Sequence, residues 1–370
     1  MANKKLEEDL KFLKKTLTLA KRGIGRVSPN PLVGAVIVKN GKIIASGYHK
    51  AAGEKHAEIV ALDKAGIEAK GATLYVNLEP CSHIGKTGPC CDEIIKAGIK
   101  RVVFSVSDPN PLVNGKGEEK LKKAGIKVSK GLLEKEANEL NEVFFKFISK
   151  KMPFVIMKSA SSLDGKIATS TGESKWITSI ESRRFVHNLR ASVDALLIGS
   201  NTLKKDNPLL DTRLIKAKKL PAVVIVNTNL TSNMNAEVFK STDKRKVFIA
   251  TAVGKSKRKQ IEPFYKMNID IIFCKKFENQ IDLNDLMTKL AEKNITSVMI
   301  EGGGEINASA LKQGIIDKFF LFFAPILIGG NNAKGFVGGS GIKKLSEAYK
   351  MDITKIKRIG RDILIVGKMS

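Results

Sequence analysis

The 370-residue sequence is poor in cysteine and has no long apolar run. Four cysteines are too few for a disulfide scaffold in a chain of this length, and Cys81, Cys90 and Cys91 cluster while Cys274 stands apart. A reduced compartment and a metal site fit this distribution better. The longest apolar stretch, 319–328, is far shorter than the roughly 20 residues that a membrane-spanning helix needs.

Two further features are scarce: an apolar N-terminus and acidic side chains. Residues 1–9 include acidic side chains where a signal peptide needs an apolar run, so we expect a cytoplasmic protein with no membrane partner. The 64 Lys and Arg against 37 Asp and Glu give a net charge of +27, which attracts phosphates or nucleic acid. Because the lysines are scattered along the whole chain, a solvated lysine surface explains the charge better, and we expect no nucleic-acid partner.

The overall composition is that of a globular protein, with 43% hydrophobic and 27% charged residues. At roughly 150 residues per domain, the length predicts two domains. A long helical pattern over 132–148 is followed by Pro153, which is typical of a boundary because proline cannot continue a helix. We therefore predict one domain over 1–150 and a second over 151–370.

Helical and strand patterns alternate in the N-terminal domain. Leu6, Leu10, Leu13 and Leu17 recur at helical spacing, and Asn40-Gly41 is a strong hairpin signal. The patterns predict helices over 6–19, 56–65, 91–97, 117–124 and 132–148, and strands over 32–38, 42–46, 72–78 and 101–106 and near 128. Alternation of this kind predicts an α/β domain with helices covering a sheet.

The C-terminal domain shows the same alternation. Strands are predicted over 154–159, 195–199, 222–226, 246–250, 270–273, 297–300 and 319–323, with helices between them. This half is therefore also predicted to be α/β.

Candidate metal ligands occur in the N-terminal domain at the ends of predicted elements. His56-Ala57-Glu58 begins a helix, Pro80-Cys81 follows a strand, and Pro89-Cys90 opens a helix. A helix N-terminus favours a thiolate over a thiol. Two thiolates and one imidazole, from Cys81, Cys90 and His56, leave the fourth tetrahedral position of a zinc ion open for water, as catalysis requires.

This set of residues predicts a hydrolytic deaminase with one zinc ion per chain. Zinc lowers the pKa of bound water towards roughly 7, which provides a hydroxide that can attack a ring carbon bearing an amine. Glu58 is the candidate catalytic acid/base. A lone His-x-Glu or a lone Pro-Cys means little, but the two together in this order are a strong signal for a zinc site. The spacing differs from that of base deaminases, because eight residues, 82–89, separate the cysteines where those enzymes have two. Cys91 is interpreted as a small buried side chain.

At these residues the chain resembles the bifunctional deaminase and reductase family of riboflavin biosynthesis. The matching stretches are 28–36, 47–49, 56–58, 78–91 and 108–111, with Gly88 where the family usually has a second proline. The eight-residue loop between the cysteines is typical of this family. The resemblance implies an N-terminal cytidine-deaminase-like three-layer domain. It also implies that a phosphorylated pyrimidine substrate contacts Asn30, His49, Ser82, His83, Lys86, Asp108 and Asn110.

The C-terminal half resembles the reductase of the same family, with matches at 158–168, 172–178, 199–202, 206–210 and 301–304. This implies a dihydrofolate-reductase-like domain. Glu301 to Gly304 lie between a predicted strand and a helix beginning near Ile306, a layout that suits backbone amides approaching a pyrophosphate, although the G-x-G-x-x-G pattern is absent.

The resemblance also implies the residues of the reductase site. NADPH would contact Ala160, Trp176, Thr202, Asp206, Gly303, Gly304, Glu305, Ile306, Asn307, Ala308 and Ser309. The substrate would contact Ser174, Arg190, Leu210, Arg213 and Glu301, with the arginines suited to its 5′-phosphate. Trp176, the only tryptophan, could equally be a core residue.

The sequence therefore predicts a two-step enzyme. Its N-terminal domain would remove the 2-amino group of 2,5-diamino-6-ribosylamino-4(3H)-pyrimidinone 5′-phosphate, and its C-terminal domain would use NADPH to reduce the ribosyl chain, giving 5-amino-6-ribitylaminouracil 5′-phosphate. We expect a homo-oligomer. Two alternatives stay open: a nucleic-acid base deaminase with an appended binding domain, which salt-dependent RNA binding would favour, and a protein in which one domain only scaffolds the other.

Overall fold

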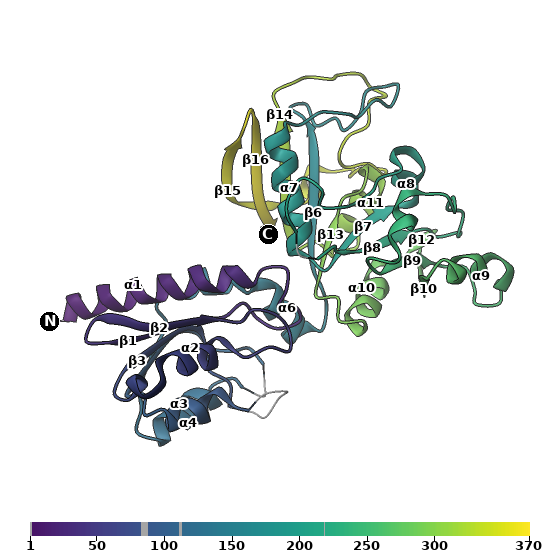
Figure 1. Cartoon of the computed structure of the whole chain (residues 1–370). Helices are drawn as coiled ribbons and strands as arrows, with labels where there is room; N and C mark the ends of the chain where they lie inside the picture. The colour runs from purple at the N-terminus through teal and green to yellow at the C-terminus, as the bar shows by residue number, and fades with distance from the viewer. Residues whose placement is uncertain (1, 83–87, 111–112, 218) are drawn as a thin grey trace. The chain divides into compact units, whose positions relative to one another are not determined.

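The computed structural model describes residues 2–82, 88–110, 113–217 and 219–370. The chain divides into two compact units, Met1–Lys151 and Met152–Ser370 (Figure 1). Each unit is described by itself. In the described part of the chain, none of the helices is both long and apolar enough to span a bilayer.

The N-terminal unit alternates strands and helices, as its sequence pattern predicts. Its α-helices are α1 (Ala2–Ala20), α2 (Ala57–Ala65), α3 (Cys90–Lys96), α4 (Lys116–Lys123), α5 (Glu134–Leu140) and α6 (Glu142–Lys150), with 3₁₀ turns at Lys21–Gly23 and Gly66–Ala69. Its strands are β1 (Gly34–Lys39), β2 (Lys42–Tyr48), β3 (Thr73–Leu78), β4 (Arg101–Val106) and β5 (Lys127–Lys130).

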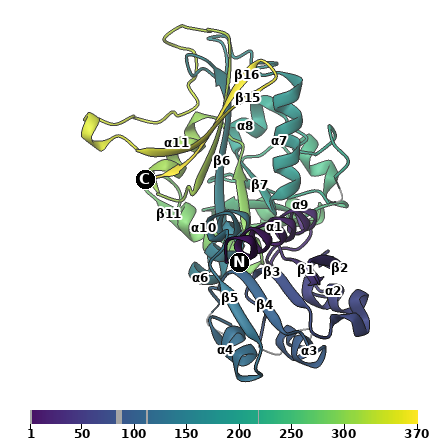
Figure 2. The same cartoon turned by 90° about the vertical axis from the view of Figure 1, so that its left-hand side faces the viewer.

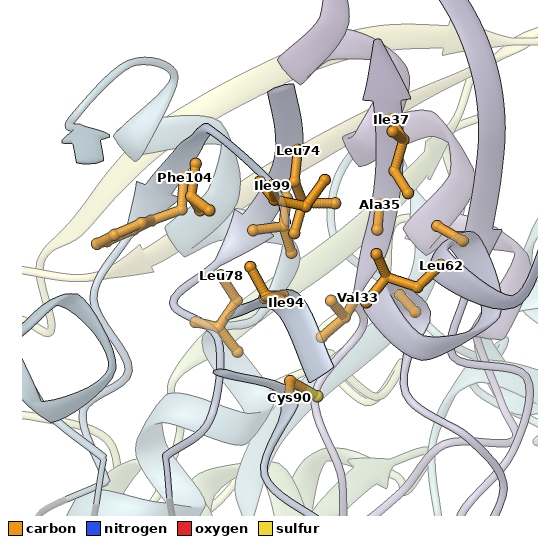
Figure 3. Close-up of a cluster of buried hydrophobic side chains, with 14 of the residues drawn as sticks. Val33, Ala35, Ile37, Leu62, Leu74, Leu78, Cys90, Ile94, Ile99 and Phe104 are labelled. Carbon is orange, nitrogen blue, oxygen red and sulfur yellow. The ribbon is translucent and has the colours of Figure 1, made fainter. Parts of the chain in front are cut away.

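The five strands form one sheet in the order β2-β1-β3-β4-β5. β1 is antiparallel to β2 and β3, whereas β3, β4 and β5 are parallel. Successive side chains of a strand point to opposite faces, and both faces are covered. Ala35 and Ile37 pack in the larger core cluster with residues of α2 and α3 (Figure 3), whereas Val36 packs with Phe12 and Leu13 of α1. The unit therefore has three layers.

The hairpin predicted at Asn40-Gly41 is confirmed. β1 and β2 are paired antiparallel on either side of these two residues, and Asn40 and Gly41 have φ angles of 52° and 73°. Asparagine and glycine tolerate this left-handed conformation, and its twist matches that of the strands it joins.

The prediction of one helix over 132–148 is wrong, because the segment folds as two helices, α5 and α6, that meet at Asn141. The side chain of Asn141 is buried and clamps Leu32: its Oδ1 accepts the Leu32 N–H at 2.8 Å, and its Nδ2 donates to the Leu32 carbonyl at 3.0 Å. Because the Asn141 side chain is hydrogen-bonded to the backbone of a distant loop, Asn141 itself does not adopt helical angles and has φ −109° and ψ 16°.

The C-terminal unit also alternates strands and helices, over a longer stretch of chain. Its α-helices are α7 (Ile180–Ser192), α8 (Ser200–Asp206), α9 (Arg258–Lys266), α10 (Leu283–Glu292) and α11 (Gly304–Lys312), with 3₁₀ turns at Glu237–Ser241 and Leu345–Glu347. Its strands are β6 (Phe154–Ser162), β7 (Ala195–Gly199), β8 (Ala222–Val226), β9 (Val247–Thr251), β10 (Ile269–Phe273), β11 (Lys276–Phe277), β12 (Gln280–Ile281), β13 (Ser297–Ile300), β14 (Lys318–Ala324), β15 (Met351–Ile359) and β16 (Asp362–Met369).

Nine of these strands form one sheet in the order β10-β9-β8-β7-β13-β6-β14-β16-β15. The strands from β10 to β14 in that order are parallel, and β16 and β15 complete the sheet in antiparallel fashion (Figure 2). The central strands β7, β8 and β13 are almost fully buried, as expected for a sheet covered on both faces.

The sequence patterns missed the terminal hairpin of β15 and β16. β15 is the edge strand, and seven of its nine side chains are exposed. The alternation of apolar and polar residues begins at Met351 but is broken by the register shift between Ile353 and Lys355, so too short a stretch of β15 shows the pattern by which a strand is recognised.

Candidate active sites

Three candidate metal ligands converge at one edge of the N-terminal sheet. His56 is the residue before α2, Cys81 follows β3, and Cys90 is the first residue of α3. The His56 Nδ1 lies 3.2 Å from the Cys90 Sγ and 3.6 Å from the Cys81 Sγ. All three candidate ligand atoms lie within 4.8 Å of one another, and no other such group occurs among the residues that the structure describes. One imidazole and two sulfurs at this spacing could hold a tetrahedral zinc ion.

The protonation of this cluster is set by its own contacts. Hydrogen bonds from Cys90 and His56 lower the pKa of the Cys81 thiol to about 4, against the opposing effect of burial. The bond to Cys81 raises the pKa of His56 to about 9, while the nearby Cys81 sulfur and burial raise the pKa of Cys90. In the absence of metal, His56 and Cys81 thus form an imidazolium and thiolate pair, and metal binding would displace the protons of His56 and Cys90.

Glu58 lies in the first turn of α2, two residues after His56, and is 4% exposed. Burial raises the pKa of its carboxyl group, against the attraction of the His56 imidazole. A carboxyl group whose pKa is moved upwards can both accept and return a proton near neutral pH. Glu58 and the cluster therefore combine a metal-binding set with a proton carrier.

His56, Glu58 and Cys81 open into one cavity of about 350 Å³, whereas Cys90 is buried and is not part of the lining. Of the sequence-predicted residues, those that line it are Asn30, His49, His56, Glu58, Cys81, Asp108 and Asn110. Ser82 is half-buried next to Cys81 but is not part of the lining. His83 and Lys86 lie outside the described residues.

Hydrogen bonds orient two of these side chains. The His49 Nδ1 lies 3.1 Å from the Lys55 carbonyl oxygen, which can only accept, so Nδ1 carries the proton. Burial lowers the pKa of His49, and the neutral ring leaves Nε2 to accept from the Asn30 amide at 3.1 Å. The neutral His49 therefore holds Asn30 in place at the cavity wall.

Asp108 is also buried at this wall. Burial raises its pKa to about 6, and its carboxylate accepts the Asn110 N–H at 2.8 Å. The pair therefore forms one turn whose two side chains reach the same cavity.

Other lining residues were missed by sequence reasoning. Phe144, Phe147 and Ile148 of α6 form an apolar wall of the cavity, and Glu79 also reaches it. In the sequence, the aromatic residues of α6 resemble an ordinary core-facing stripe. Glu79 lies within the matching stretch 78–91, which was the available signal for it.

A second cavity, of about 470 Å³, lies in the C-terminal unit near the carboxyl ends of β7, β8 and β13. Ligands of open α/β sheets bind at this edge. The helix predicted to begin near Ile306 starts earlier, at Gly304, so that its first turn lines the cavity. A Cβ on Gly304 would lie 2.8 Å from the Gly335 carbonyl oxygen and from the Gly338 nitrogen, so only glycine permits this packing.

The structure gathers part of the predicted cofactor set around this cavity. The lining contains Thr202, Asp206, Gly303, Gly304, Glu305, Ile306 and Ser309, and also Ser174 from the predicted substrate set. Ala160, Trp176, Asn307 and Ala308 are not part of the lining. Trp176 is 60% exposed, with the Arg183 guanidinium 4.2 Å from its ring centroid. Asn332 and Lys334 also line the cavity; they belong to the glycine-rich run 329–341, which was not predicted to be part of the site.

The remaining predicted residues form a charged cluster. The Arg190 Nε and Nη2 donate to the Glu301 carboxylate at 2.6 and 2.9 Å, and Nη1 donates to the Asp211 carbonyl at 2.8 Å. The Lys158 ammonium lies 3.7 Å from Glu301. Although burial opposes it, these cations lower the pKa of Glu301 to about 2.

Leu210 and Arg213 lie on the same stretch of chain as Asp211. Arg213 is half-exposed and pairs with the Asp211 carboxylate at 2.6 Å, and Arg245 donates to the Leu210 carbonyl. Arg245, Lys158 and Asp211 were not predicted, although Lys158 belongs to a matching stretch.

Together the two units define a class of protein. A His, Cys, Cys cluster beside a buried glutamate in a three-layer α/β unit is the arrangement of zinc-dependent ring deaminases. The second unit presents a glycine-rich helix N-terminus at the carboxyl ends of parallel strands, which suits a nucleotide cofactor. The chain is thus a two-part enzyme.

Comparisons with known proteins identify the family. Residues 6–106 match the model of the cytidine and deoxycytidylate deaminase zinc-binding region, and residues 153–365 match the RibD C-terminal domain. The chain is 42% identical over 357 residues to the riboflavin biosynthesis protein RibD of Actinobacillus pleuropneumoniae, covering 96% of this chain and 94% of that protein. It is 43% identical to RibD of Aquifex aeolicus, covering 98% and 99%.

Solved structures agree with this result. The fold matches a Thermotoga maritima diaminohydroxyphosphoribosylaminopyrimidine deaminase / 5-amino-6-(5-phosphoribosylamino)uracil reductase at 36% identity, covering 98% of this chain and 99% of that one, with a TM-score of 0.88. It matches Acinetobacter baumannii RibD at 32% identity over 99% of both chains, with a TM-score of 0.86.

The chain belongs to the RibD family of riboflavin biosynthesis. It is a bifunctional enzyme, with a cytidine-deaminase-like unit followed by a dihydrofolate-reductase-like unit, as the sequence predicts.

The neighbouring residues Cys90 and Cys91 provide a matched test of the metal site. The Cys91 Sγ is buried 3.4 Å from the Pro80 carbonyl and 3.7 Å from the Gly117 carbonyl, away from the ligand group. We expect Cys90→Ala to lose bound zinc and Cys91→Ala to retain one zinc ion per chain, as measured by elemental analysis. Loss of zinc from Cys91→Ala alone would contradict the ligand assignment.

Proposed function

We propose that the N-terminal unit hydrolyses the 2-amino group of 2,5-diamino-6-ribosylamino-4(3H)-pyrimidinone 5′-phosphate. The observation that carries this proposal is the convergence of His56, Cys81 and Cys90 within 4.8 Å, beside a cavity lined by His56, Cys81 and Glu58. Membership of the RibD family supports the choice of substrate.

His56, Cys81 and Cys90 would hold the catalytic zinc, since one imidazole and two sulfurs are the donor set of this metal. When bound, zinc supplies a water whose pKa is lowered towards neutrality. Glu58 takes a proton from the attacking water and delivers it to the ring nitrogen; it then takes the proton of the hydroxyl added to the ring carbon and transfers it to the departing amine, which leaves as ammonia. Its burial supports this role, because a carboxylic acid shielded from solvent passes its proton to the substrate instead of to water.

Seating of the ring is proposed to depend on polar side chains around the same cavity. Asn30, His49, Asp108 and Asn110 line it and offer both donors and acceptors to ring and ribose. On the resemblance, Ser82, His83 and Lys86 complete this set, with the Lys86 ammonium suited to the 5′-phosphate.

For the C-terminal unit we propose NADPH-dependent reduction of the ribosyl chain to a ribityl chain. When bound, NADPH supplies a hydride to the sugar carbon, which is electrophilic only in its ring-opened form. The first turn of α11 supports a pyrophosphate site, because its backbone N–H groups lack intrahelical partners. The proposed contacts are Ala160, Trp176, Thr202, Asp206 and Gly303 to Ser309.

The reductase substrate is proposed to contact Ser174, Arg190, Leu210, Arg213 and Glu301. Arg190 commits three N–H groups to Glu301 and Asp211, whereas the Arg213 side chain is 50% exposed. Arg213 is therefore the better-placed cation for the 5′-phosphate, and the Arg190–Glu301 pair is suited to fixing neutral polar groups of the substrate.

We propose a homo-oligomer, which the edge of the larger sheet supports. β15 pairs on one side only, and Ile353 and Ile356 are 54% and 64% exposed. A long edge strand with exposed apolar side chains is a template for pairing with another copy. The free thiols of the four cysteines support a reducing, cytoplasmic location.

Replacement of the proposed acid/base separates the two activities. Glu58→Gln is nearly isosteric but cannot shuttle a proton, so we expect ammonia release to fall by about 10³-fold while zinc content is unchanged. Supplied with the deaminated intermediate, the same variant should oxidise NADPH at the wild-type rate. Retained ammonia release would contradict the role of Glu58, and absent NADPH oxidation in the wild type would contradict the proposed reductase.

Trp176 provides the test of cofactor binding. Loss of its ring in Trp176→Ala removes an aromatic contact worth about 1 kcal/mol, so we expect the KM for NADPH to rise about fivefold or more. Trp176→Phe should retain most of the affinity, and deamination should be unchanged in both variants. An equal loss of both activities would show that Trp176 is only structural.

The proposed assembly is tested by sedimentation velocity. A lysine at the centre of the apolar edge should oppose pairing, so we expect Ile356→Lys to sediment as a smaller species than the wild type. Ile67→Lys, at a 90% exposed isoleucine of the other unit, is the matched control and should leave the assembly intact. A monomeric wild-type protein at micromolar concentration would overturn the proposal.

A further inference from the structure

The buried carboxylate of Glu79 holds together two ends of the segment that carries Asp108. Glu79 lies between β3 and Cys81 and is 3% exposed. Its Oε2 accepts the backbone N–H groups of Asp108 at 3.2 Å and Gly115 at 3.1 Å. Its Oε1 accepts those of Gly117 at 3.0 Å and Glu118 at 3.1 Å.

This arrangement uses both side-chain oxygens at position 79 as acceptors. A carboxylate has two oxygens with about four lone-pair sites in all, and the four backbone N–H groups use them. The amide of a glutamine would direct two N–H groups at two of these donors. The four bonds are therefore matched to glutamate, and replacing one oxygen by NH₂ would break the pattern without removing bulk.

Glu79 also belongs to the segment that carries a metal ligand. Its own N–H donates to the Val106 carbonyl at 3.0 Å, which ties it to the end of β4. The next residue, Pro80, packs directly on the start of α4, because a Cβ on Gly117 would lie 2.1 Å from the Pro80 carbonyl oxygen. The Cys81 segment and the start of α4 are therefore in direct contact.

Asp108 connects Glu79 to the polar side chains of the cavity wall. Glu79 holds the Asp108 N–H, and the Asp108 carboxylate in turn accepts the Asn110 N–H. Glu79, Cys81, Asp108 and Asn110 all line the cavity that contains Glu58. The pairing of β3 with β4 brings the two segments together, and the Glu79 carboxylate adds a side-chain link between Asp108 and the Cys81 segment.

We infer that Glu79 is a positioning residue of the deamination: by holding Asp108 and Asn110 against the Cys81 segment, it fixes where the substrate ring is seated relative to the metal ligands. This inference rests on the proposed function, since it takes Asp108 to contact the substrate. Glu79 acts through Asp108, so its loss changes substrate seating and not metal binding.

The test is Glu79→Gln in the full-length zinc-loaded protein. Misplacement of a seating group by about 1 Å costs up to about 100-fold in rate, so we expect kcat/KM for deamination to fall about 10- to 100-fold. Most of this loss should appear in KM. Zinc should stay at one per chain, and NADPH oxidation with the deaminated intermediate should be unchanged.

Two variants accompany it. Glu119→Gln makes the same replacement at an exposed carboxylate in the first turn of α4 and should behave as wild type. Glu79→Asp retains the charge on a shorter side chain; it should show a smaller loss and serves as the test variant if Glu79→Gln does not fold.

A double-mutant cycle with Asp108→Ala identifies the route of the effect. Because Glu79 acts through Asp108, adding Glu79→Gln to Asp108→Ala should lower kcat/KM by less than about threefold further. Additive losses would overturn the inference, as would wild-type kinetics of Glu79→Gln beside a defective Asp108→Ala. Parallel loss of zinc and of reductase activity in Glu79→Gln would overturn it as well, since Glu79 would then only maintain the fold. Wild-type kinetics of Asp108→Ala would instead overturn the proposed substrate set, and the inference with it.

Discussion

The approach of one imidazole and two thiols to within 4.8 Å is the constraint on which the N-terminal unit depends. Three elements must end or begin at the same place for it to hold: β3 before Cys81, α2 after His56 and α3 at Cys90. Backbone bonds reinforce the contact, since the Cys91 N–H donates to the Cys81 carbonyl and the Cys90 N–H to the Cys81 Sγ. Because a tetrahedral metal tolerates little change in ligand position, the surrounding packing serves this geometry.

Both units place their chemistry at the carboxyl ends of parallel strands but use different groups. In the N-terminal unit the side chains that follow β3 and β4 line the cavity, and the Glu79 carboxylate accepts a hydrogen bond from the backbone of Asp108. In the C-terminal unit the approach of backbone matters more: Gly304 allows the loop at Gly335 to contact the first turn of α11. Side chains suit acid/base work, whereas backbone N–H groups suit an extended anionic cofactor.

Local features were predictable, and long-range ones were not. The hairpin at Asn40 depends on neighbouring residues, and so do the strand that precedes Cys81 and the helix that begins at Cys90. Local patterns therefore predict these elements correctly. The break at Asn141 depends instead on Leu32, which is 109 residues away in the chain. The exposed β15 lacks the burial on which strand recognition depends.

Residue types at short spacing beside helix and strand ends were enough to predict the candidate zinc ligands and the candidate proton carrier, and to identify the family. The surroundings of these residues became visible only in the folded chain, such as Phe147 at the cavity wall and the hydrogen bond from Asp108 to Glu79. The reason is physical: these contacts depend on how parallel strands and distant helices align, and a local pattern does not encode that alignment.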